Sequence, residues 1–299
     1  FTSSSSMESL LRLMDTEIAY SHLPITSNKV GSWRFVEPFL EKKNPPCSQG
    51  CPLNQNIREA CSFLEKDDVL QAFFAMAKKN PLLYATGTVC PHFCQQECNR
   101  NQVDSSLLIG NIEAFLGENQ IDQSLSSLKV SSFFQKKIAI IGAGPSGLSA
   151  AYQAARYGAS VQIFEQEALA GGMVQYGIPD LRLNKKLFQQ EISRIFTSFP
   201  QISLKLNQSI NPSDIQNMAL EFDYVLLALG NQKGIQSEIP FVLSGIESLK
   251  KHHPGTYQFL TQGHYIVLGG GNTAMDVAFY LLHNKNQVSV LVRREKKQM

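Results

Sequence analysis

All six cysteines of the 299-residue chain lie between Cys47 and Cys98. In order they read Cys47-x3-Cys51-Pro, then Cys61, then Cys90-Pro-x2-Cys94-x3-Cys98. Thiols at such spacings can form disulfides, bind zinc or hold an iron–sulfur cluster. The remainder from residue 99 to 299 contains no cysteine, unlike a disulfide-dense scaffold, so the clustering favours a metal.

The spacing also bears on which metal is bound. Zinc sites usually pair their ligands as Cys-x2-Cys with a second pair at similar spacing, and that pattern is missing here. His92 could join a zinc site, but one histidine within a turn is more often a bystander. Iron–sulfur clusters use four thiolates, often with Cys-Pro at the edge of the motif, and proline follows both Cys51 and Cys90. An iron–sulfur cluster is therefore favoured, and zinc stays open as the alternative.

A glycine-rich turn follows the apolar segment 138–141. Gly142 permits a tight turn, Gly144 allows the backbone to approach a pyrophosphate, and Gly147 lets helix and strand pack closely. The following helix would present its N-terminal N–H groups to the phosphates. Glu165 ends the next predicted strand, where an acid binds the ribose hydroxyls. This context predicts a dinucleotide site; the alternative is a tight turn without a ligand.

A second turn of the same kind reads Gly269-Gly270-Gly271-Asn272-Thr273-Ala274, after the apolar segment 265–268. Its next strand ends at Arg293 and Arg294 instead of an acid. Guanidinium groups can pair with the 2′-phosphate of NADPH, which an acid would repel. The second turn therefore predicts NADPH in preference to NADH, unless these arginines belong to a solvated basic run. Two such turns in series suggest a tightly bound flavin and an exchangeable nicotinamide.

The elements that would position these motifs change in type along the chain. Apolar spacings predict helices over 57–66 and 69–79, the latter ended by Asn-Pro at 80–81, and a short helix over 111–116 ended by Gly117. Cys61 falls on the apolar face of the first helix, as a buried core cysteine would. The serine-rich stretch 123–133 resembles a linker. From Lys137 onward, strands alternate with helices, including a buried strand within 222–230, which predicts an α/β fold with parallel sheets.

Composition limits the remaining possibilities. Hydrophobic residues make up 43% and charged residues 17%, as in globular proteins, and the net charge of +2 gives no argument for nucleic acid. No apolar run reaches the ~20 residues of a membrane span, and the start lacks a secretory signal pattern. We expect a cytoplasmic protein. Because the first methionine is Met7, the residues before it suggest translation overhang or a fragment edge.

Several segments together resemble the glutamate synthase small-subunit family, which includes the N-terminal half of dihydropyrimidine dehydrogenase. They are "GSWR", "PPCSQGCPLNQNI", "NPLLYATGTVCPHFCQQECNR", "IGNIEAFLGE", "IAIIGAGPSGLSAA", "GGMVQYGIPDLRLNKKLFQQEI", "DYVLLALG" and "VLGGGNTAMDVA…VLVRRE". The resemblance runs from about Gly31 to the C-terminus. It implies an all-α iron–sulfur domain followed by Rossmann-like FAD and NAD(P)H units. The implied domains are an extension 1–30, an iron–sulfur domain 31–122, a linker 123–135, an FAD unit 136–262 and the start of an NAD(P)H unit 263–299.

The resemblance also implies roles for individual residues. FAD would be held by Gly142, Gly144, Pro145, Ser146, Gly147, Glu165, Gly171, Gly172, Tyr176, Gly177, Ile178, Pro179 and Gly230. NADPH would be held by Gly269, Gly271, Asn272, Thr273, Ala274, Arg293 and Arg294. Cluster thiolates would come from Cys47, Cys51, Cys90, Cys94 and Cys98. For the segment 171–179 the alternative is a plain Gly/Pro turn. No side chain is assigned a catalytic role, because hydride and electron transfer need none of their own.

Two departures from the family alter these expectations. Members with two 4Fe–4S clusters carry further cysteines upstream of Cys47, and residues 35–44 contain none, so we predict one 4Fe–4S cluster. Glu113 aligns with a non-cysteine ligand of dihydropyrimidine dehydrogenase, but a helix-surface or capping role is expected. The family continues beyond the second turn, so we expect a C-terminally truncated chain whose residues 265–299 are poorly ordered alone.

The resulting expectation is an oxidoreductase that passes electrons from NADPH via FAD and a 4Fe–4S cluster to a ferredoxin or a larger oxidoreductase subunit. A hetero-oligomer is expected, without nucleic acid. One alternative is the small subunit of NADPH-dependent glutamate synthase. Others are a truncated, non-enzymatic interaction module and a zinc-binding structural domain.

Overall fold

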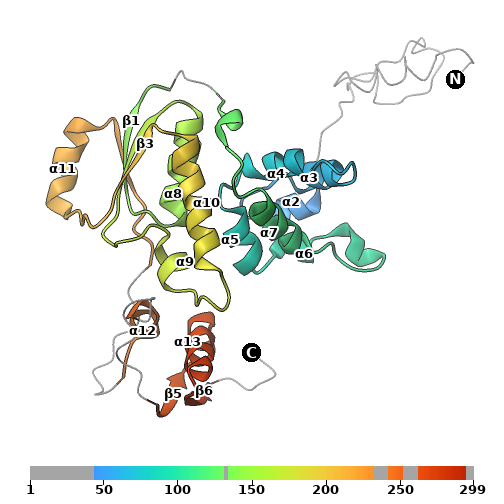
Figure 1. Cartoon of the computed structure of the whole chain (residues 1–299), viewed down its shortest axis with the longest axis vertical. Coiled ribbons are helices and arrows are strands. Elements are labelled where there is room, and N and C mark those ends of the chain that lie inside the picture. The colour runs from blue at the N-terminus through green and yellow to red at the C-terminus, as the bar shows by residue number, and fades with distance from the viewer. Residues whose placement is uncertain (1–43, 131–133, 232–241, 252–261, 294–299) are drawn as a thin grey trace, which may run out of the picture. The chain divides into compact units, whose positions relative to one another are not determined.

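The computed structural model of the protein describes residues 44–130, 134–231, 242–251 and 262–293 (Figure 1). Contacts divide the chain into two units at Pro45, and every helix and strand described below belongs to the unit from Pro46 onward. The predicted extension 1–30, the segment from Gly31 to residue 43 and Arg294 lie outside the described residues.

The N-terminal half of this unit is helical. Its elements are α2 (Pro46–Gly50), α3 (Ile57–Leu64), α4 (Val69–Ala77), α5 (Leu83–Val89), α6 (Phe93–Gln96), η3 (Asn99–Gln102) and α7 (Ile109–Asn119). The helices predicted over 57–66 and 69–79 are confirmed as α3 and α4. Asp68 caps α4 by accepting a hydrogen bond of 3.0 Å from the Gln71 N–H. The apolar residues that recur at three- and four-residue spacings therefore lie on helices, as the sequence predicted.

Helix α7 differs from its prediction, because Gly117 does not end it. A Cβ at Gly117 would lie 2.7 Å from the Tyr84 Cα, and one at Gly87 would lie 2.8 Å from the Ala114 Cα. Both glycines therefore serve the close packing of α5 against α7. A glycine near a helix end was interpreted as a stop signal, whereas here it allows two backbones to approach.

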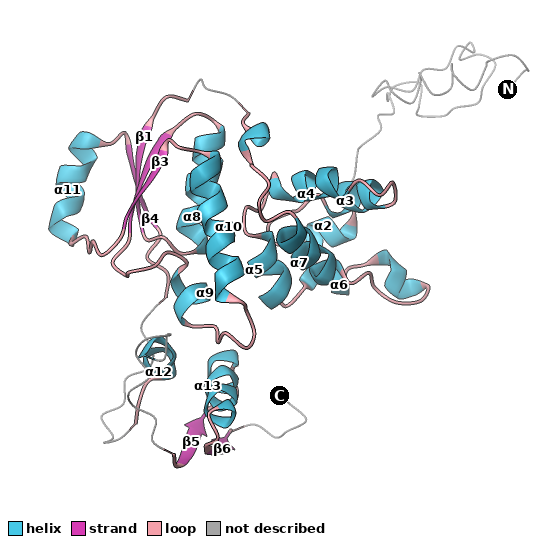
Figure 2. Cartoon of the chain, in the orientation of Figure 1, coloured by secondary structure: helices cyan, strands magenta, loops and turns pink. Residues whose placement is uncertain are grey.

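The next part is a four-stranded parallel sheet in the order β3-β2-β1-β4. Its strands are β1 (Lys137–Ile141), β2 (Ser160–Phe164), β3 (Ile202–Lys205) and β4 (Tyr224–Leu227). Helices α8 (Pro145–Arg156) and α10 (Lys185–Ser198) cover one face, and α11 (Pro212–Glu221) covers the other (Figure 2). Helix α9 (Gly172–Tyr176) lies in the connection between β2 and α10. The predicted α/β fold with helices on both faces is confirmed.

Strand β4 was predicted to be buried, and this is wrong. Tyr224 and Leu227 are both 53% exposed. Within the described residues β4 pairs only with β1, so it forms an edge of the sheet. A continuous apolar run is typical of a central parallel strand, and the sequence of one strand does not reveal how many neighbours it has.

The segment 264–291, called the C-terminal unit below, repeats the strand–helix–strand pattern. Strand β5 (His264–Leu268) pairs in parallel with β6 (Gln287–Leu291), and α13 (Asn272–His283) connects them. Helix α12 (Gly245–Lys251) packs against α13. Ile266, Leu268 and Phe279 are largely exposed on this small unit. The expectation that residues 265–299 are poorly ordered alone stays a prediction.

A single hydrophobic cluster extends from the helical half into the sheet. It contains Phe73, Leu83 and Leu116 of the helices together with Tyr152 and Phe188 of the α/β part. Leu125, inside the predicted linker, is also fully buried in this cluster. The helical half therefore packs directly on α8 and α10.

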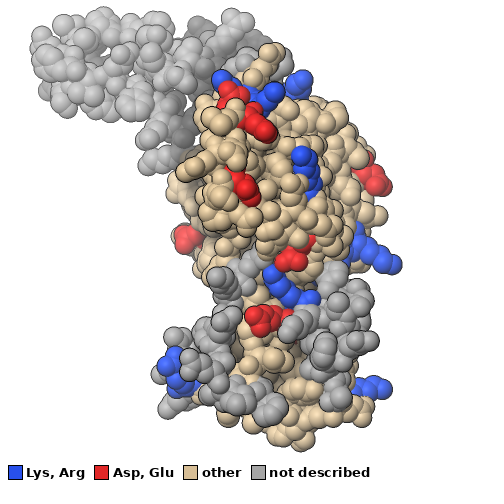
Figure 3. Space-filling model, turned by 90° about the vertical axis from the view of Figure 1, so that its left-hand side faces the viewer, with Lys and Arg blue, Asp and Glu red and all other residues tan. Residues whose placement is uncertain are grey.

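On the face drawn in Figure 3, basic and acidic side chains lie interspersed among uncharged ones. In the part of the chain that the structure describes, we find no helix of the length and apolarity that a membrane crossing requires.

Candidate functional site

The first glycine-rich turn connects β1 to α8 through a close backbone approach. Gly142 has a φ of 107°, and a Cβ there would overlap the Ala228 carbonyl at the end of β4. A Cβ at Gly147 would overlap the Gly142 carbonyl oxygen and lie 3.1 Å from its carbon. Gly142 and Gly147 therefore perform the local roles predicted for them, a tight turn and close packing of α8 on β1.

The N-terminus of α8 leaves its first N–H groups without a side-chain cap. Gly144 is the N-cap residue and Pro145 follows in the first turn, with no side chain capping the helix. The first N–H groups of a helix have no partner within the helix and carry partial positive charge. Ser146 belongs to this first turn, so the predicted residues 144–147 present backbone donors suited to phosphate oxygens.

Glu165 follows β2 beside this turn and is 3% exposed. Its carboxylate accepts hydrogen bonds from the Ala143 N–H (2.7 Å) and the Glu167 N–H (3.0 Å), which fix its orientation. The structure places Gly142, Glu165 and Gly230 around one cavity of about 390 Å³. The remaining lining comes from the strand residues Ile141 and Phe164 and from loop residues to which the sequence assigned no role: Gln166, Gln208, Ser209, Ile210, Leu229 and Asn231.

The predicted flavin loop, residues 171–179, contacts the same turn. Gly171 and Gly172 have φ values of 121° and 52°, and a Cβ at Gly172 would lie 2.8 Å from the Gly144 Cα. The hydroxyl of Tyr176 accepts a hydrogen bond of 2.9 Å from the Leu169 N–H. Burial raises the pKa of Tyr176. Gly144 of the first turn and Gly172 of this loop therefore lie side by side, although they are far apart in the sequence.

The other end of this loop faces the C-terminal unit. Tyr176, Ile178 and Pro179 line a second cavity of about 360 Å³ together with Tyr280 and His283 of α13. Gly177 packs against the Met173 side chain within the same loop, where a Cβ at Gly177 would lie 2.9 Å from the Met173 carbonyl oxygen. The predicted flavin loop and the predicted nicotinamide unit thus share a cavity.

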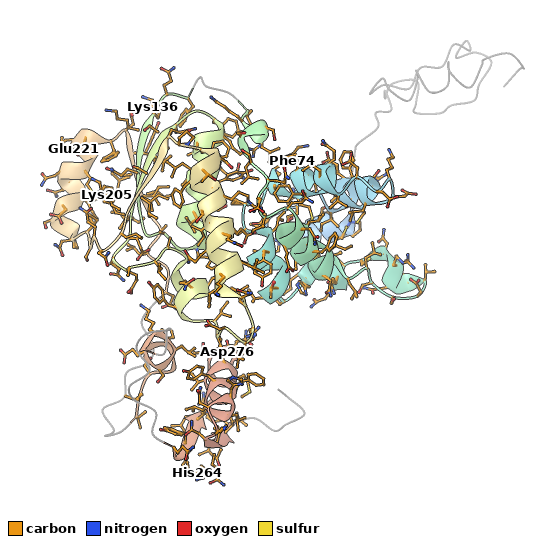
Figure 4. All side chains as sticks on the ribbon, viewed as in Figure 1. Phe74, Lys136, Lys205, Glu221, His264 and Asp276 are labelled. Atoms are coloured by element: carbon orange, nitrogen blue, oxygen red, sulfur yellow. The ribbon has the colours of Figure 1, made fainter. Side chains whose placement is uncertain are left out.

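Arg182 and Asp276 form an ion pair across this junction, at 2.7 Å. Asp276 lies on α13 near its start (Figure 4), and its side chain is almost fully buried. Nearby, Lys185 donates a hydrogen bond of 2.5 Å to the Val174 carbonyl, and burial lowers its pKa to about 8. None of these three residues was predicted from the sequence, because no local pattern indicates the partner of Arg182, which lies 94 positions away, or the burial of Lys185.

The second glycine-rich turn is more open than the first. Gly269 has a φ of 119°, and a Cβ there would meet only the Cβ of Ala274, at 3.8 Å. Gly271 is the N-cap of α13, and a Cβ there would meet nothing within 4 Å. Asn272 and Thr273 form the first turn of α13. Ala274 stands at the position where the first turn has its third glycine.

Arg293 is described two residues beyond the end of β6, and its predicted neighbour Arg294 is not described. Its place after the second strand of the unit is the one that the sequence predicted. Its role toward a 2′-phosphate stays a prediction.

None of the six cysteines forms a disulfide; Cys94 and Cys98 are buried, and the other four are partly buried. Cys47 lies in α2, Cys94 lies in α6, and these two short helices pack on each other. Cys90 is the C-cap residue of α5. Within residues 44–130 and the other described ranges, no three His, Cys, Asp or Glu side chains converge on a point as the ligands of a single metal ion do.

Burial and neighbouring charges raise the pKa of several of these thiols. Burial, followed by the charges of Cys51, Glu113 and Cys90, raises the pKa of the Cys94 thiol to about 11. Burial is also the largest cause that raises the pKa of Cys47 and of Cys61, and the charge of Cys98 raises both further. These three thiols therefore hold their protons more tightly than an exposed cysteine does.

His92, interpreted from the sequence as a bystander, shapes the loop that carries Cys90. Its φ is 57°, and its backbone N–H donates to the Cys90 Sγ at 3.4 Å. Its ring Nε2 lies 3.1 Å from the Gly87 carbonyl oxygen, and a Cβ at Gly110 would overlap that ring. The imidazole therefore fills the space between the end of α5 and the start of α7.

Glu113 was expected on a helix surface or at a cap, and this is wrong. It is 5% exposed, because α7 turns it toward α5. Its Oε1 accepts hydrogen bonds from Gln55 (2.7 Å), Asn80 (2.9 Å) and Thr86 (2.5 Å). Burial raises the pKa of Glu113, and these three hydrogen bonds oppose that effect. The buried Gln55 Oε1 has no hydrogen-bond partner in this network.

The helical half holds donors of the kind that an iron–sulfur cluster takes. Its thiols are those of Cys47, Cys51, Cys90, Cys94 and Cys98. The N–H···S bond from His92 to Cys90 is of the kind that tunes cluster sulfurs. The buried Gln55 Oε1 is costly unless a further group compensates it.

Two protein families match this chain, one over its helical half and the other over its α/β part. Residues 39–125 match the family described as dihydropyrimidine dehydrogenase domain II, 4Fe-4S cluster. Residues 136–298 match the family described as pyridine nucleotide-disulphide oxidoreductase. The two matched regions coincide with the helical half and with the two strand–helix–strand parts.

Individual relatives show the same likeness. YgfK of Escherichia coli O157:H7 is 31% identical over 270 residues, which cover 88% of this chain and 26% of that protein. The beta subunit of NADPH-Fe(3+) oxidoreductase of Geobacter sulfurreducens is 29% identical over 278 residues, covering 88% and 41%. The small chain of NADPH glutamate synthase of Escherichia coli K12 is 26% identical over 312 residues, covering 92% and 65%. The chain therefore spans less than two thirds of the length of each of these relatives.

Among solved structures, FprA of Mycobacterium tuberculosis in complex with NADPH matches 49% of this chain and 36% of its own, with a TM-score of 0.42 and 23% identity.

Proposed function

Because this chain belongs to the pyridine nucleotide-disulphide oxidoreductase family, preceded by a 4Fe–4S domain of the dihydropyrimidine dehydrogenase type, we propose that it is part of an electron-transferring subunit. In this proposal electrons pass from NADPH through FAD and one 4Fe–4S cluster to a partner protein or a ferredoxin. The observation that carries the proposal is the juxtaposition of a pyrophosphate-type turn, a buried ribose-type acid and a cavity between them.

The FAD site is proposed around the first turn. Residues 144–147 would bind the pyrophosphate, and Glu165 would accept hydrogen bonds from the ribose hydroxyls in the cavity that it lines. Support comes from the Ala143 N–H, which holds the Glu165 carboxylate in place before any ligand arrives. When bound, the flavin supplies the chemistry that accepts a hydride and releases single electrons. The protein binds and orients; no side chain is proposed as an acid or base.

The loop at 171–179 would cover the flavin and its ribityl chain. Its support is the contact of Gly172 with the Gly144 backbone, because side chains at these positions would block the approach. Tyr176, Ile178 and Pro179 reach the cavity shared with α13. This arrangement would bring a nicotinamide held by the second turn toward the flavin and limit the access of water.

NADPH is proposed at the second turn. The backbone of residues 271–274 would bind the pyrophosphate at the start of α13, and Arg293 with Arg294 would bind the 2′-phosphate. Support comes from the space around Gly269 and Gly271, where a ligand can approach the backbone.

One 4Fe–4S cluster is proposed within the cysteine region, for which the sequence offers Cys47, Cys51, Cys90, Cys94 and Cys98. These five thiols exceed the four ligand positions of one cluster, and five thiolates cannot build two all-cysteine clusters. Residues 35–44 provide no further cysteine.

The acceptor is proposed to be a larger oxidoreductase subunit. Two relatives bear the names of beta subunits, an NADPH-Fe(3+) oxidoreductase in Geobacter sulfurreducens and an NADP(+)-dependent formate dehydrogenase in Moorella thermoacetica. The second candidate is a glutamate synthase small chain, favoured because that relative is matched over 65% of its own length, against 41% for each of the two beta subunits. A partner subunit that produces glutamate from glutamine would support it.

The nicotinamide assignment is tested with the full chain, purified anaerobically and loaded with FAD, iron and sulfide. Oxidation of NADPH and of NADH is measured with ferricyanide as an artificial acceptor. Arg293→Glu should raise the KM for NADPH about tenfold or more, since a hydrogen bond to a charged group is worth about 1.5–3 kcal/mol. NADH oxidation should change little.

Lys66→Glu is the matched control, because it reverses an exposed positive charge in the turn after α3, in the helical half. An unchanged KM for NADPH in Arg293→Glu would refute the proposed site. Equal losses in Arg293→Glu and Lys66→Glu would indicate a general effect of charge instead.

A further inference from the structure

Helix α5, which ends at Cys90, has no cap of its own at its start. Its N-cap residue is Leu82, whose side chain cannot accept a hydrogen bond. The missing acceptor comes from α10. Glu191 is fully buried, and its carboxylate accepts hydrogen bonds from the Tyr84 N–H (2.7 Å) and the Ala85 N–H (3.2 Å). A residue of the flavin-binding half therefore caps a helix of the cluster-binding half.

Arg194 lies one turn further along α10 and binds the neighbouring helix ends. It donates to the Gln120 carbonyl (3.0 Å), at the C-terminus of α7, and to the Pro81 carbonyl (3.1 Å), just before α5. Its guanidinium lies 4.9 Å from the ring centre of Phe73 on α4 and 3.5 Å from the Glu191 carboxylate. A negative group thus meets the start of α5 and a positive group meets the end of α7, as the helix dipoles favour.

The opposite ends of α5 and α7 carry the proposed cluster site. Cys90 ends α5, and the ring of His92 packs between Gly87 near that end and Gly110 at the start of α7. A helix of this length spans about 10 Å, and the two helices pack backbone to backbone through Gly87 and Gly117. Because the pair has little freedom to bend, movement at the start of α5 is transmitted to Cys90.

Stability alone is a poor explanation for two buried charges at this junction. A buried ion pair costs desolvation, and apolar residues of similar size often stabilise a protein as well or better. Glu191 and Arg194 instead make directional hydrogen bonds to four backbone groups of one helix pair: the N–H groups of Tyr84 and Ala85 and the carbonyls of Pro81 and Gln120. Such contacts fix orientation, which an apolar contact does not.

We propose that Glu191 and Arg194 are positioning residues for electron transfer, which hold the α5–α7 pair, and with it Cys90 and its cluster, in a fixed orientation on the flavin-binding half. This inference rests on the proposed function. It adds a specific prediction, that the two side chains control the cluster and its exchange of electrons with the flavin while contributing nothing to the binding of FAD or NADPH.

The test compares Glu191→Gln and Arg194→Lys with Tyr152→Phe in the full, cofactor-loaded chain. Tyr152 donates a buried hydrogen bond of 2.8 Å to the Ala77 carbonyl at the end of α4, across the same junction, but α4 carries none of the proposed ligands. Tyr152→Phe therefore removes a comparable contact without touching α5 or α7. Glu191→Gln preserves the shape of the side chain, and Arg194→Lys preserves the charge but not the fork of donors.

Hydrogen–deuterium exchange over residues 83–90 should become about fivefold faster in Glu191→Gln, since a lost helix cap costs roughly 1 kcal/mol, and remain at the wild-type rate in Tyr152→Phe. The EPR line shape and midpoint potential of the reduced cluster should change in Glu191→Gln and Arg194→Lys only. The rate of flavin reduction by NADPH should stay constant in all three variants, while the following transfer to the cluster slows in the first two.

Two results would overturn the positioning role and leave the proposed function intact. They are unchanged exchange over α5 in Glu191→Gln, or a cluster spectrum that changes equally in Tyr152→Phe. If Glu191→Gln fails to fold, Arg194→Lys decides by the same measurements. A wild-type chain that takes up FAD but no cluster, or neither, would refute the proposed function, and the positioning role would fall with it. The cofactor content of the wild-type chain thus separates the two failures.

Discussion

The two glycines of the first turn, Gly144 and Gly147, should respond to alanine in different ways. A Cβ at Gly147 would overlap the Gly142 carbonyl oxygen, so α8 must move away from β1 by roughly 1 Å to reach ordinary contact distance. A Cβ at Gly144 would meet only the Gly172 Cα, at 3.8 Å, and its φ of −74° suits alanine. Only Gly147→Ala should therefore strain the protein itself.

Overpacking of this kind costs about 1–3 kcal/mol, which corresponds to a fall in melting temperature of about 2–10 °C for a domain of this size. The same displacement moves the N-terminus of α8 away from the pyrophosphate, so Gly147→Ala should weaken FAD binding roughly 5- to 150-fold. In Gly144→Ala the melting temperature without FAD should stay within about 1 °C of wild type. Its affinity for FAD should still fall, because the new methyl group would occupy the space of the pyrophosphate.

The assay is thermal unfolding of each variant without cofactor, followed by titration with FAD monitored by flavin fluorescence. If Gly147→Ala without FAD melts at the wild-type temperature, the proposed steric role is refuted. If Gly144→Ala binds FAD as tightly as wild type, the pyrophosphate does not lie at this turn.

Three further predictions concern other parts of the site. Burial raises the pKa of Glu191 from 4.5 to about 7, so its favourable contribution to folding is complete below about pH 4.5 and lost as the pH rises through 7. Urea unfolding should show wild type losing about 3 kcal/mol relative to Glu191→Gln across that range, and a parallel pH profile would contradict it. The charge reversal Asp276→Arg should slow flavin reduction by NADPH several-fold. Adding Arg182→Glu should restore part of the rate, and no restoration would mean that the ion pair does not orient α13. Cys61→Ala should keep the iron content of wild type, measured by a chromogenic iron assay, and loss of iron would place Cys61 among the ligands.

The two glycine-rich turns could be predicted because each of their constraints is local. The strand, the turn and the helix follow one another, and Gly142 and Gly147 meet within that short segment. Glu165 could be predicted for the same reason, since it ends the strand that pairs beside the turn. Motifs whose parts are adjacent in sequence report directly on the fold.

Features that depend on distant partners could not be predicted. Glu113 reads as a polar residue of a short helix, and only the packing of α7 against α5 shows that it is buried among Gln55, Asn80 and Thr86. Glu191 likewise reads as an ordinary helix residue, yet its two partners lie 106 and 107 positions away. The edge position of β4 escaped prediction because apolar residues in a strand do not show which of its neighbours are present.

The central claim is that one chain holds a flavin and a single iron–sulfur cluster. The most direct measurement is the content of iron, acid-labile sulfide and FAD in the anaerobically purified 299-residue chain. We expect about four iron and about four sulfide atoms with stoichiometric FAD. We expect loss of iron in Cys94→Ala, with FAD unchanged. Iron near eight, zinc in place of iron, or full iron content in Cys94→Ala would contradict the claim.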